Sequence, residues 1–252
     1  MKRFICVYLI VILCVATVLP TAASAETYKL GGTDISISVD NSKWYVFTRD
    51  NIKDNPELKK LGISYDTIYG ILYDNDAYMD AIMFYEDGGY IEMFVRKKPV
   101  DAGLVNLSNY KDSEVLDFAK ELAKKAGAEN YTVCENQYKF ARLDYKDNKL
   151  GYYMCEFITC VNKDNYTVTF QATSQYTQEE YAEIEKIVDS IQFDVDTSIK
   201  EPIRFRFNLV RMVLAGAAVG GIAGGIVAIK TKKKKKQNEK MEATTPDIKE
   251  IQ

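Results

Sequence analysis

The sequence predicts an α+β domain, in which helices pack on an antiparallel sheet, followed by one C-terminal transmembrane helix. Three observations lead to this expectation. Several stretches alternate apolar and polar residues, as strands with one buried face do. Two others, 114–126 and 177–191, carry apolar residues at helical spacing. Residues 212–229 contain no charge and lie between Arg211 and Lys230, which is typical of a membrane span.

The first 25 residues have the pattern of a secretory signal peptide. Two basic residues precede an apolar run, and the small residues Ala23 and Ala25 predict cleavage before Glu26. The alternative is an uncleaved anchor, which would leave both chain ends in the cytoplasm. Cleavage leaves residues 26–203 as an extracytoplasmic domain, long enough to bury a core of its own.

The domain opens with two candidate strands. Residues 34–39 alternate apolar and polar side chains, and residues 44–48 are aromatic and β-branched. The turn-forming residues 40–42 between them predict a hairpin.

Two short helices are expected next. Asp54 or Asn55 can cap a helix over 56–61, with proline in its first turn and Gly62 at its end. A second short helix is expected over 64–71.

The middle of the domain combines a hairpin, a loop and a helix. Strands are expected over 78–85 and 90–96, joined by a tight turn at Asp87-Gly88. A long loop over 97–112 leads to the helix 114–126. Gly127 can end this helix, whose apolar stripe consists of Val115, Phe118, Ala119, Leu122 and Ala126.

Three strands are expected after this helix, over 131–145, 152–161 and 166–173, with turns at 147–148 and 164–165. The last strand places Val168, Phe170 and Ala172 on one face and Thr167, Thr169 and Gln171 on the other, which predicts one buried face and one solvated face.

The last predicted element of the domain is a helix. Thr177 and Glu180 form a capping box at its start. Its apolar face consists of Tyr181, Ile184, Ile187, Val188 and Ile191.

Four stretches give the chain a resemblance to a known fold: SVDNSKWYVFTRDN, NPELKKLGIS, EMFVRK and YTQEEYAEIEKIVDSIQFDV. Residues 30–195 resemble the PsbP-like superfamily, which includes a photosystem II extrinsic protein, a Ran-binding import factor and exported proteins of Gram-positive bacteria. The resemblance implies an α+β sandwich and, since characterised members bind other proteins, a binding role. None of the four stretches is a catalytic motif, so no site residue carries over.

The segment after the domain predicts the topology. A basic segment, 204–211, precedes the span 212–229, and the tail 230–252 begins with a stop-transfer run made of Lys230, Lys232, Lys233, Lys234, Lys235 and Lys236. Because positive residues stay in the cytoplasm, this order predicts a single-pass protein of the cell membrane with a cytoplasmic tail. A buried core helix is the alternative for the span.

Small residues recur every four positions within the span. Gly216, Gly220 and Gly224 form one row, and Ala217, Gly221 and Gly225 form a second row beside it. Such rows let two helices approach closely in lipid, which predicts homo-oligomerisation or pairing with another membrane helix. The alternative is that the small residues only fill the span.

Charge and residue usage exclude several functions. Residues 26–203 carry 20 basic and 32 acidic side chains, a net charge of −12, so nucleic acid is an improbable partner. The chain has no histidine, which removes Ser-His and Cys-His nucleophiles. Cys155 and Cys160 are five apart on one strand and therefore face opposite ways, and with Cys134 they form no zinc-like spacing.

The densest carboxylate cluster is a weak metal candidate. Asp74, Asp76 and Asp80, with Glu86 and Asp87 one hairpin away, could hold calcium through oxygen ligands, but they do not fit an EF-hand loop. Turns and solvated helix ends explain the same residues. The expected cofactor is therefore none.

Two classes of function remain. The first is a membrane-anchored binding or scaffolding module that meets an unidentified envelope protein. The second is either an envelope enzyme that works as a carboxylate-based hydrolase or a calcium-binding surface protein. The absence of a catalytic motif favours the first class. The 18 tyrosines either form a sugar- or peptide-binding surface or lie half-buried at strand edges.

Overall fold

The computed structural model describes residues 25–99 and 106–195, and these form an α+β domain with antiparallel sheets, as predicted. Within these residues no helix is both long and apolar enough to cross a membrane. Several predicted features lie outside the described residues. They are the apolar run of the signal peptide with Ala23, the basic segment 204–211, the span 212–229 with its glycine rows, and the lysine run.

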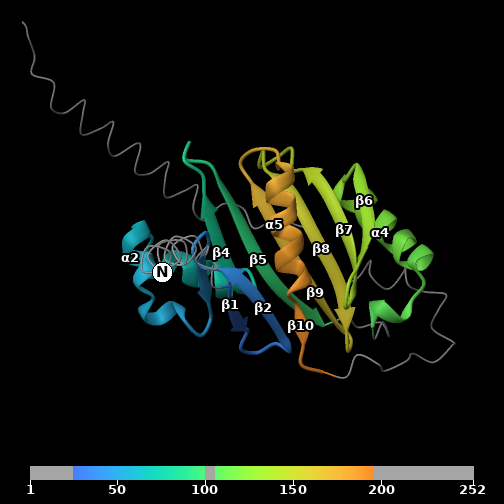
Figure 1. Ribbon diagram of the computed structural model, residues 1–252, viewed down its shortest axis with the longest axis horizontal. Coiled ribbons are helices and arrows are strands. Elements are labelled where there is room, and N and C mark those ends of the chain that lie inside the picture. Colours follow the sequence, from blue (N-terminus) through green and yellow to red (C-terminus); the bar gives the residue numbers. More distant parts are fainter. Residues whose placement is uncertain (1–24, 100–105, 196–252) are drawn as a thin grey trace, which may run out of the picture.

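A seven-stranded antiparallel sheet forms the centre of the domain, with the order β3-β4-β5-β9-β8-β7-β6 (Figure 1). Its strands are β3 (Tyr45–Thr48), β4 (Ala77–Phe84), β5 (Tyr90–Pro99), β6 (Asn130–Glu135), β7 (Lys139–Lys146), β8 (Tyr153–Val161) and β9 (Asp164–Ala172).

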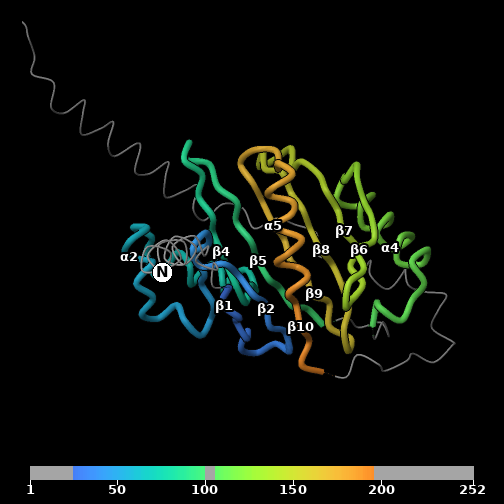
Figure 2. The backbone as a smooth tube through the Cα atoms, viewed as in Figure 1, coloured from blue at the N-terminus to red at the C-terminus, as the bar shows by residue number. Residues whose placement is uncertain are grey.

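A second, smaller sheet has the order β1-β2-β10. It consists of β1 (Ala25–Lys29), β2 (Ile35–Asp40) and β10 (Gln192–Phe193). Figure 2 shows how the chain brings β10 back to β2, where Gln192 pairs with Ser36. The domain therefore closes by joining its second and last strands.

Helical segments connect the strands. They are η1 (Ile52–Asp54), α2 (Pro56–Leu61), α3 (Tyr65–Tyr69), the π-helix η2 (Gly70–Asp74), η3 (Leu107–Asn109), α4 (Asp112–Ala126) and α5 (Gln178–Asp189).

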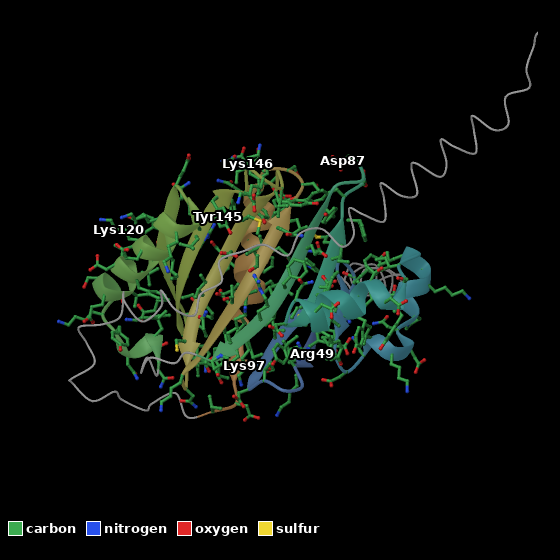
Figure 3. The ribbon with its side chains drawn as sticks, turned by 180° about the vertical axis from the view of Figure 1, so that it is seen from behind. Arg49, Asp87, Lys97, Lys120, Tyr145 and Lys146 are labelled. Atoms are coloured by element: carbon green, nitrogen blue, oxygen red, sulfur yellow. The ribbon has the colours of Figure 1, made fainter. Side chains whose placement is uncertain are left out.

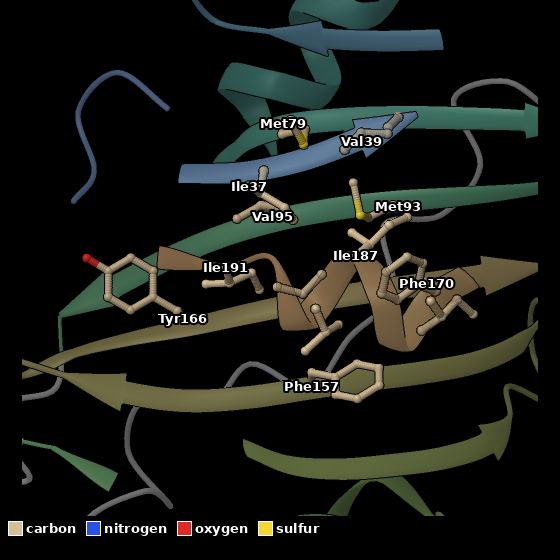
Figure 4. Packing of buried hydrophobic residues seen from close by; sticks show 14 of the residues in the cluster. Ile37, Val39, Met79, Met93, Val95, Phe157, Tyr166, Phe170, Ile187 and Ile191 are labelled. Atoms are coloured by element: carbon tan, nitrogen blue, oxygen red, sulfur yellow. The ribbon is translucent and has the colours of Figure 1, made fainter. Parts of the chain in front are cut away.

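Both faces of the large sheet are covered, so the prediction of a solvated face is wrong. On one face, α5 and the small sheet pack on β-strand residues such as Phe157 and Phe170 (Figure 4). On the other, α2, α3 and η2 pack around Phe94, and α4 packs around Leu143 (Figure 3). Thr169, predicted to face water, is therefore 0% exposed.

Local sequence signals place the helices correctly. The Asn55 side chain accepts a hydrogen bond from the Glu57 backbone N–H at the start of α2, and Gly62 ends this helix at φ 63°. The predicted capping box of Thr177 and Glu180 is present at the start of α5. The predicted stripe of α4 packs against the sheet, and Gly127 ends the helix at φ 70°.

The predicted opening hairpin does not form. Strands β2 and β3 lie in different sheets, because the turn after Asp40 carries the chain from one layer to the other. The Trp44 backbone N–H donates to the Asp40 carbonyl at 3.0 Å, and the Trp44 ring enters the core between the layers. β1, which the sequence did not reveal, is the actual partner of β2.

Two further boundaries differ from the prediction. The single strand expected over 131–145 is two strands, β6 and β7, because the chain turns at residues 136–138. The β8–β9 turn lies at Asn162-Lys163, with φ values of 49° and 69°, rather than at 164–165. Two consecutive positive φ angles match the twist of a two-residue hairpin, and asparagine tolerates them.

The cysteines lie as their spacing predicts. Cys155 belongs to the core under α5 and Cys160 to the core under α4, on opposite faces of the sheet. Among the described residues no disulfide involves them or Cys134.

Candidate functional site

A pocket of about 410 Å³ opens at the end of the large sheet where β7 leads into β8. Figure 3 shows this end, marked by Tyr145 and Lys146, with Lys97 at the opposite end of the sheet. The walls come from the α4–β6 loop, the ends of β7 and β8, and the start of α5. They consist of Gly127, Glu129, Asn130, Asp144, Tyr145, Lys146, Asn148, Tyr153, Met154, Gln175, Tyr176 and Tyr181.

The β7–β8 turn beside the pocket is held by Asp147. Its carboxylate accepts hydrogen bonds from the backbone N–H groups of Lys149 and Leu150, at 2.8 and 3.1 Å. Its carbonyl accepts from Gly151, which adopts φ 79°. This local turn, which the sequence predicted, fixes the backbone that presents Asn148.

Four tyrosines contribute most of the aromatic wall. The Tyr176 hydroxyl donates to the Tyr153 carbonyl at 3.1 Å, and the rings of Tyr176 and Tyr181 lie 5.1 Å apart. Burial raises the pKa of Tyr181 to about 12 and also raises the pKa of Tyr145 and of Tyr176. These phenols therefore remain protonated at neutral pH and act as hydrogen-bond donors, not as bases.

One arginine organises the wall between α5 and the sheet. The Arg142 guanidinium binds both oxygens of Asp144, at 2.9 and 3.2 Å, and also binds Glu185 of α5 at 2.8 Å. Its central carbon lies 4.7 Å from the Tyr181 ring centre. The Arg142 guanidinium thus ties the Asp144 carboxylate to α5.

Behind the pocket, a row of polar side chains runs across the covered face of the sheet. Tyr145 lies at the pocket end, and burial together with the charge of Glu156 raises the pKa of its phenol. Glu156 accepts a hydrogen bond from the Thr169 hydroxyl at 3.2 Å, and the Arg96 guanidinium donates to that same hydroxyl at 3.2 Å.

The row continues to two buried carboxyl groups, Asp80 of β4 and Glu92 of β5, which are 0% and 1% exposed. The Gln171 amide donates to Glu92 at 2.6 Å. Among the described residues no group donates to either oxygen of Asp80 or to Glu92 Oε1, and Gln171 Oε1 has no partner.

Burial favours the protonated forms of these two carboxyl groups. Burial and the charge of Glu92 raise the pKa of Asp80 well above its usual value. Burial raises the pKa of Glu92 to about 7. Burial without a cationic partner therefore favours the protonated form of Asp80.

The predicted carboxylate cluster is not a single group. Asp80 lies in the sheet, Asp74 and Asp76 lie at the turn before β4, and Glu86 and Asp87 follow the far end of β4. No group of three or more aspartate, glutamate, cysteine or histidine side chains within 25–99 and 106–195 could hold a metal ion.

Sequence reasoning did not find the pocket or the carboxyl pair. The sequence groups Asp80 only with its neighbours along the chain, and no pattern singles out Glu92. Tyrosines do gather, both in the pocket and in a second group, Tyr65, Tyr69 and Tyr73, each about 40% exposed with adjacent ring centres at 5.6 and 4.4 Å.

The sequence matches no protein-family model and none of the curated proteins with which it was compared. Similar solved structures include a protein from Bacteroides thetaiotaomicron VPI-5482, at 12% identity and a TM-score of 0.36. That match covers 71% of this chain and 54% of the other, so this chain spans about half of that protein's length.

Cyanobacterial PsbP (CyanoP) from Synechocystis sp. PCC 6803 is also similar, at 10% identity and a TM-score of 0.38, over 69% of this chain and 94% of that chain. A PsbP structure is thus among the structural neighbours, as the sequence resemblance predicts.

Proposed function

We propose that the protein is a membrane-anchored binding module that presents its pocket to a partner in the cell envelope, on the outer side of the membrane. The tyrosine-lined pocket is the observation that carries the proposal. A concave site with aromatic walls and a few polar groups is the usual form of a ligand site. Its volume of about 410 Å³ lies in the range of such sites.

The chemistry of the pocket supports binding rather than catalysis. Burial raises the pKa of the Tyr145, Tyr176 and Tyr181 phenols, and the Asp144 carboxylate is held by Arg142. The two carboxyl groups that do approach each other, Asp80 and Glu92, are buried in the sheet and do not line the pocket. Of the two carboxylates in the pocket walls, Asp144 and Glu129, the first is held by Arg142, which leaves only Glu129 where a hydrolase needs two.

The location of the domain can be tested by proteolysis. Protease added to intact protoplasts should digest residues 26–203 and spare a tag placed after Gln252, because the lysines following the span keep the tail inside. The mass of the mature chain should begin at Glu26. A domain protected from protease, or a mature chain that retains residues 1–25, would contradict the proposed topology.

A further inference from the structure

We propose that the basic segment 204–211 of the same chain docks on a column of exposed tyrosines formed by α3 and η2. This contact lies away from the pocket and goes beyond the proposed function, because it determines how the domain sits on its own anchor. The chemistry of the column, its place beside the exit of the chain, and the composition of the segment support it.

The tyrosine column consists of Tyr65, Tyr69 and Tyr73, which follow one another along α3 and the π-helix η2. The ring centres of Tyr65 and Tyr69 lie 5.6 Å apart, and those of Tyr69 and Tyr73 lie 4.4 Å apart. The Arg49 guanidinium continues the column, at 4.9 Å from the Tyr73 ring centre and 4.0 Å from that of Tyr78. The column therefore already binds one guanidinium group at its inner end, and its three tyrosines are open to solvent.

Two carboxylates lie beside the tyrosine column. Asp66 and Asp74 directly follow its first and last tyrosines, and Gly70 follows the middle one. The neighbouring row of the helical surface thus has an acid at each end and no side chain between them. Both aspartates are exposed, and in the described part of the chain no ion pair involves either of them. Such a surface suits arginine, which stacks on aromatic rings and pairs with carboxylates.

The inner end of the column lies close to the point where the chain leaves the domain. The Asp194 backbone N–H donates to the Asp34 carbonyl at 2.7 Å. In the same β1–β2 turn, Gly32 packs so closely on Tyr78 that a β-carbon at this position would lie 3.2 Å from the ring. Tyr78 in turn lies against the Arg49 guanidinium. Direct contacts therefore connect the last described residues with the tyrosine column.

The segment that follows has the complementary chemistry. Eight residues, 196–203, separate Val195 from Arg204, and in an extended chain they span about 30 Å, more than the length of the column. The segment begins with the sequence RFRF. In an extended chain, Arg204 and Arg206 project to one side, toward the tyrosines and the two carboxylates, and the phenylalanines project to the other. Because the segment is tethered, its effective concentration at the column is on the order of millimolar, so individually weak contacts suffice.

Site-specific photocrosslinking of the full-length protein in mild detergent tests this proposal. A photo-reactive phenylalanine analogue in place of Tyr69 should give, in monomeric chains, an internal adduct that peptide mapping assigns to residues 204–211. The same analogue in place of Tyr131, which is 36% exposed on β6, is the control and should give no adduct with this segment.

Charge reversal identifies the contacts. Arg204→Glu with Arg206→Glu should lower the yield of the adduct from position 69 at least about fivefold. In that background, Asp66→Arg with Asp74→Arg should restore most of the yield, and both aspartates are exposed, so the fold should tolerate the change.

The proposal would be overturned by the absence of an adduct with 204–211 from position 69, by equal adducts from both positions, or by a yield that the arginine reversal leaves unchanged. Failure of the reversed aspartates to restore the yield would overturn it in favour of another acidic surface. An adduct that joins two chains would overturn it in favour of a second copy as the occupant.

Discussion

Raising the pH from about 4.5 to about 7 is expected to lower the free energy of unfolding by about 3 kcal/mol through Glu92 alone. Burial raises the pKa of this carboxyl from 4.5 to about 7 in the folded domain. At low pH the Glu92 carboxyl is protonated in both the folded and the unfolded state, so it does not lower the free energy of unfolding. As the pH rises, the unfolded chain ionises first, so the folded state loses stability until its own pKa is passed.

Thermal unfolding of the full-length protein in mild detergent measures this loss. Trp44 is the only tryptophan and is 2% exposed in the core, so its fluorescence reports on unfolding. The midpoint should fall by roughly 10 °C over this pH range. Glu92→Gln should remove most of the fall, because the amide keeps its size and does not ionise. Glu86→Gln, at an exposed position, should behave as wild type. Equal pH dependence in all three proteins would contradict the buried carboxyl pair.

Substitutions at two adjacent positions of β9 are expected to destabilise the domain equally strongly, although they face opposite ways. Phe170→Ala should cost about 3–5 kcal/mol, because the ring lies between Trp44 and Phe157, with ring centres at 6.4 and 6.2 Å. Thr169→Lys should also cost about 3–5 kcal/mol, because it places an ammonium group in a covered site beside Arg96.

Urea unfolding of the same full-length protein provides the measurement. Thr132→Lys on the exposed strand β6 is the control and should change stability by no more than about 0.5 kcal/mol. If Thr169→Lys were as mild as this control, the second face of the sheet would be solvated, as the sequence alone had suggested, and the covered polar row would not exist.

The sequence predicted the elements whose signals are local. Backbone groups at the helix ends find their partners within a few residues. The patterns that mark these ends can therefore be recognised without knowledge of the fold: Asn55 with Pro56, Thr177 with Glu180, and Gly127. The failures concern strand pairing. β2 pairs with β1 and β10 instead of the next strand, and neither partner has a strong pattern of its own.

The candidate site escaped sequence analysis for the same reason. The pocket combines side chains from the α4–β6 loop, the β7–β8 turn and the start of α5, which meet only after the sheet has formed. Alternation along β9 separated the two faces correctly but could not show that helices would cover the second face. Gln171 therefore resembled a solvated strand residue, although its side chain is buried and hydrogen-bonded to Glu92.

The central claim is that the domain binds through the pocket at the β7–β8 end of the sheet. A photo-reactive residue in place of Asn148, on the pocket wall, tests it directly in intact cells, with the same residue in place of Asp117, exposed on α4, as control. Irradiation should give a discrete adduct of the full-length chain from position 148 and none from position 117. No adduct at 148, or the same adduct from both positions, would contradict the claim.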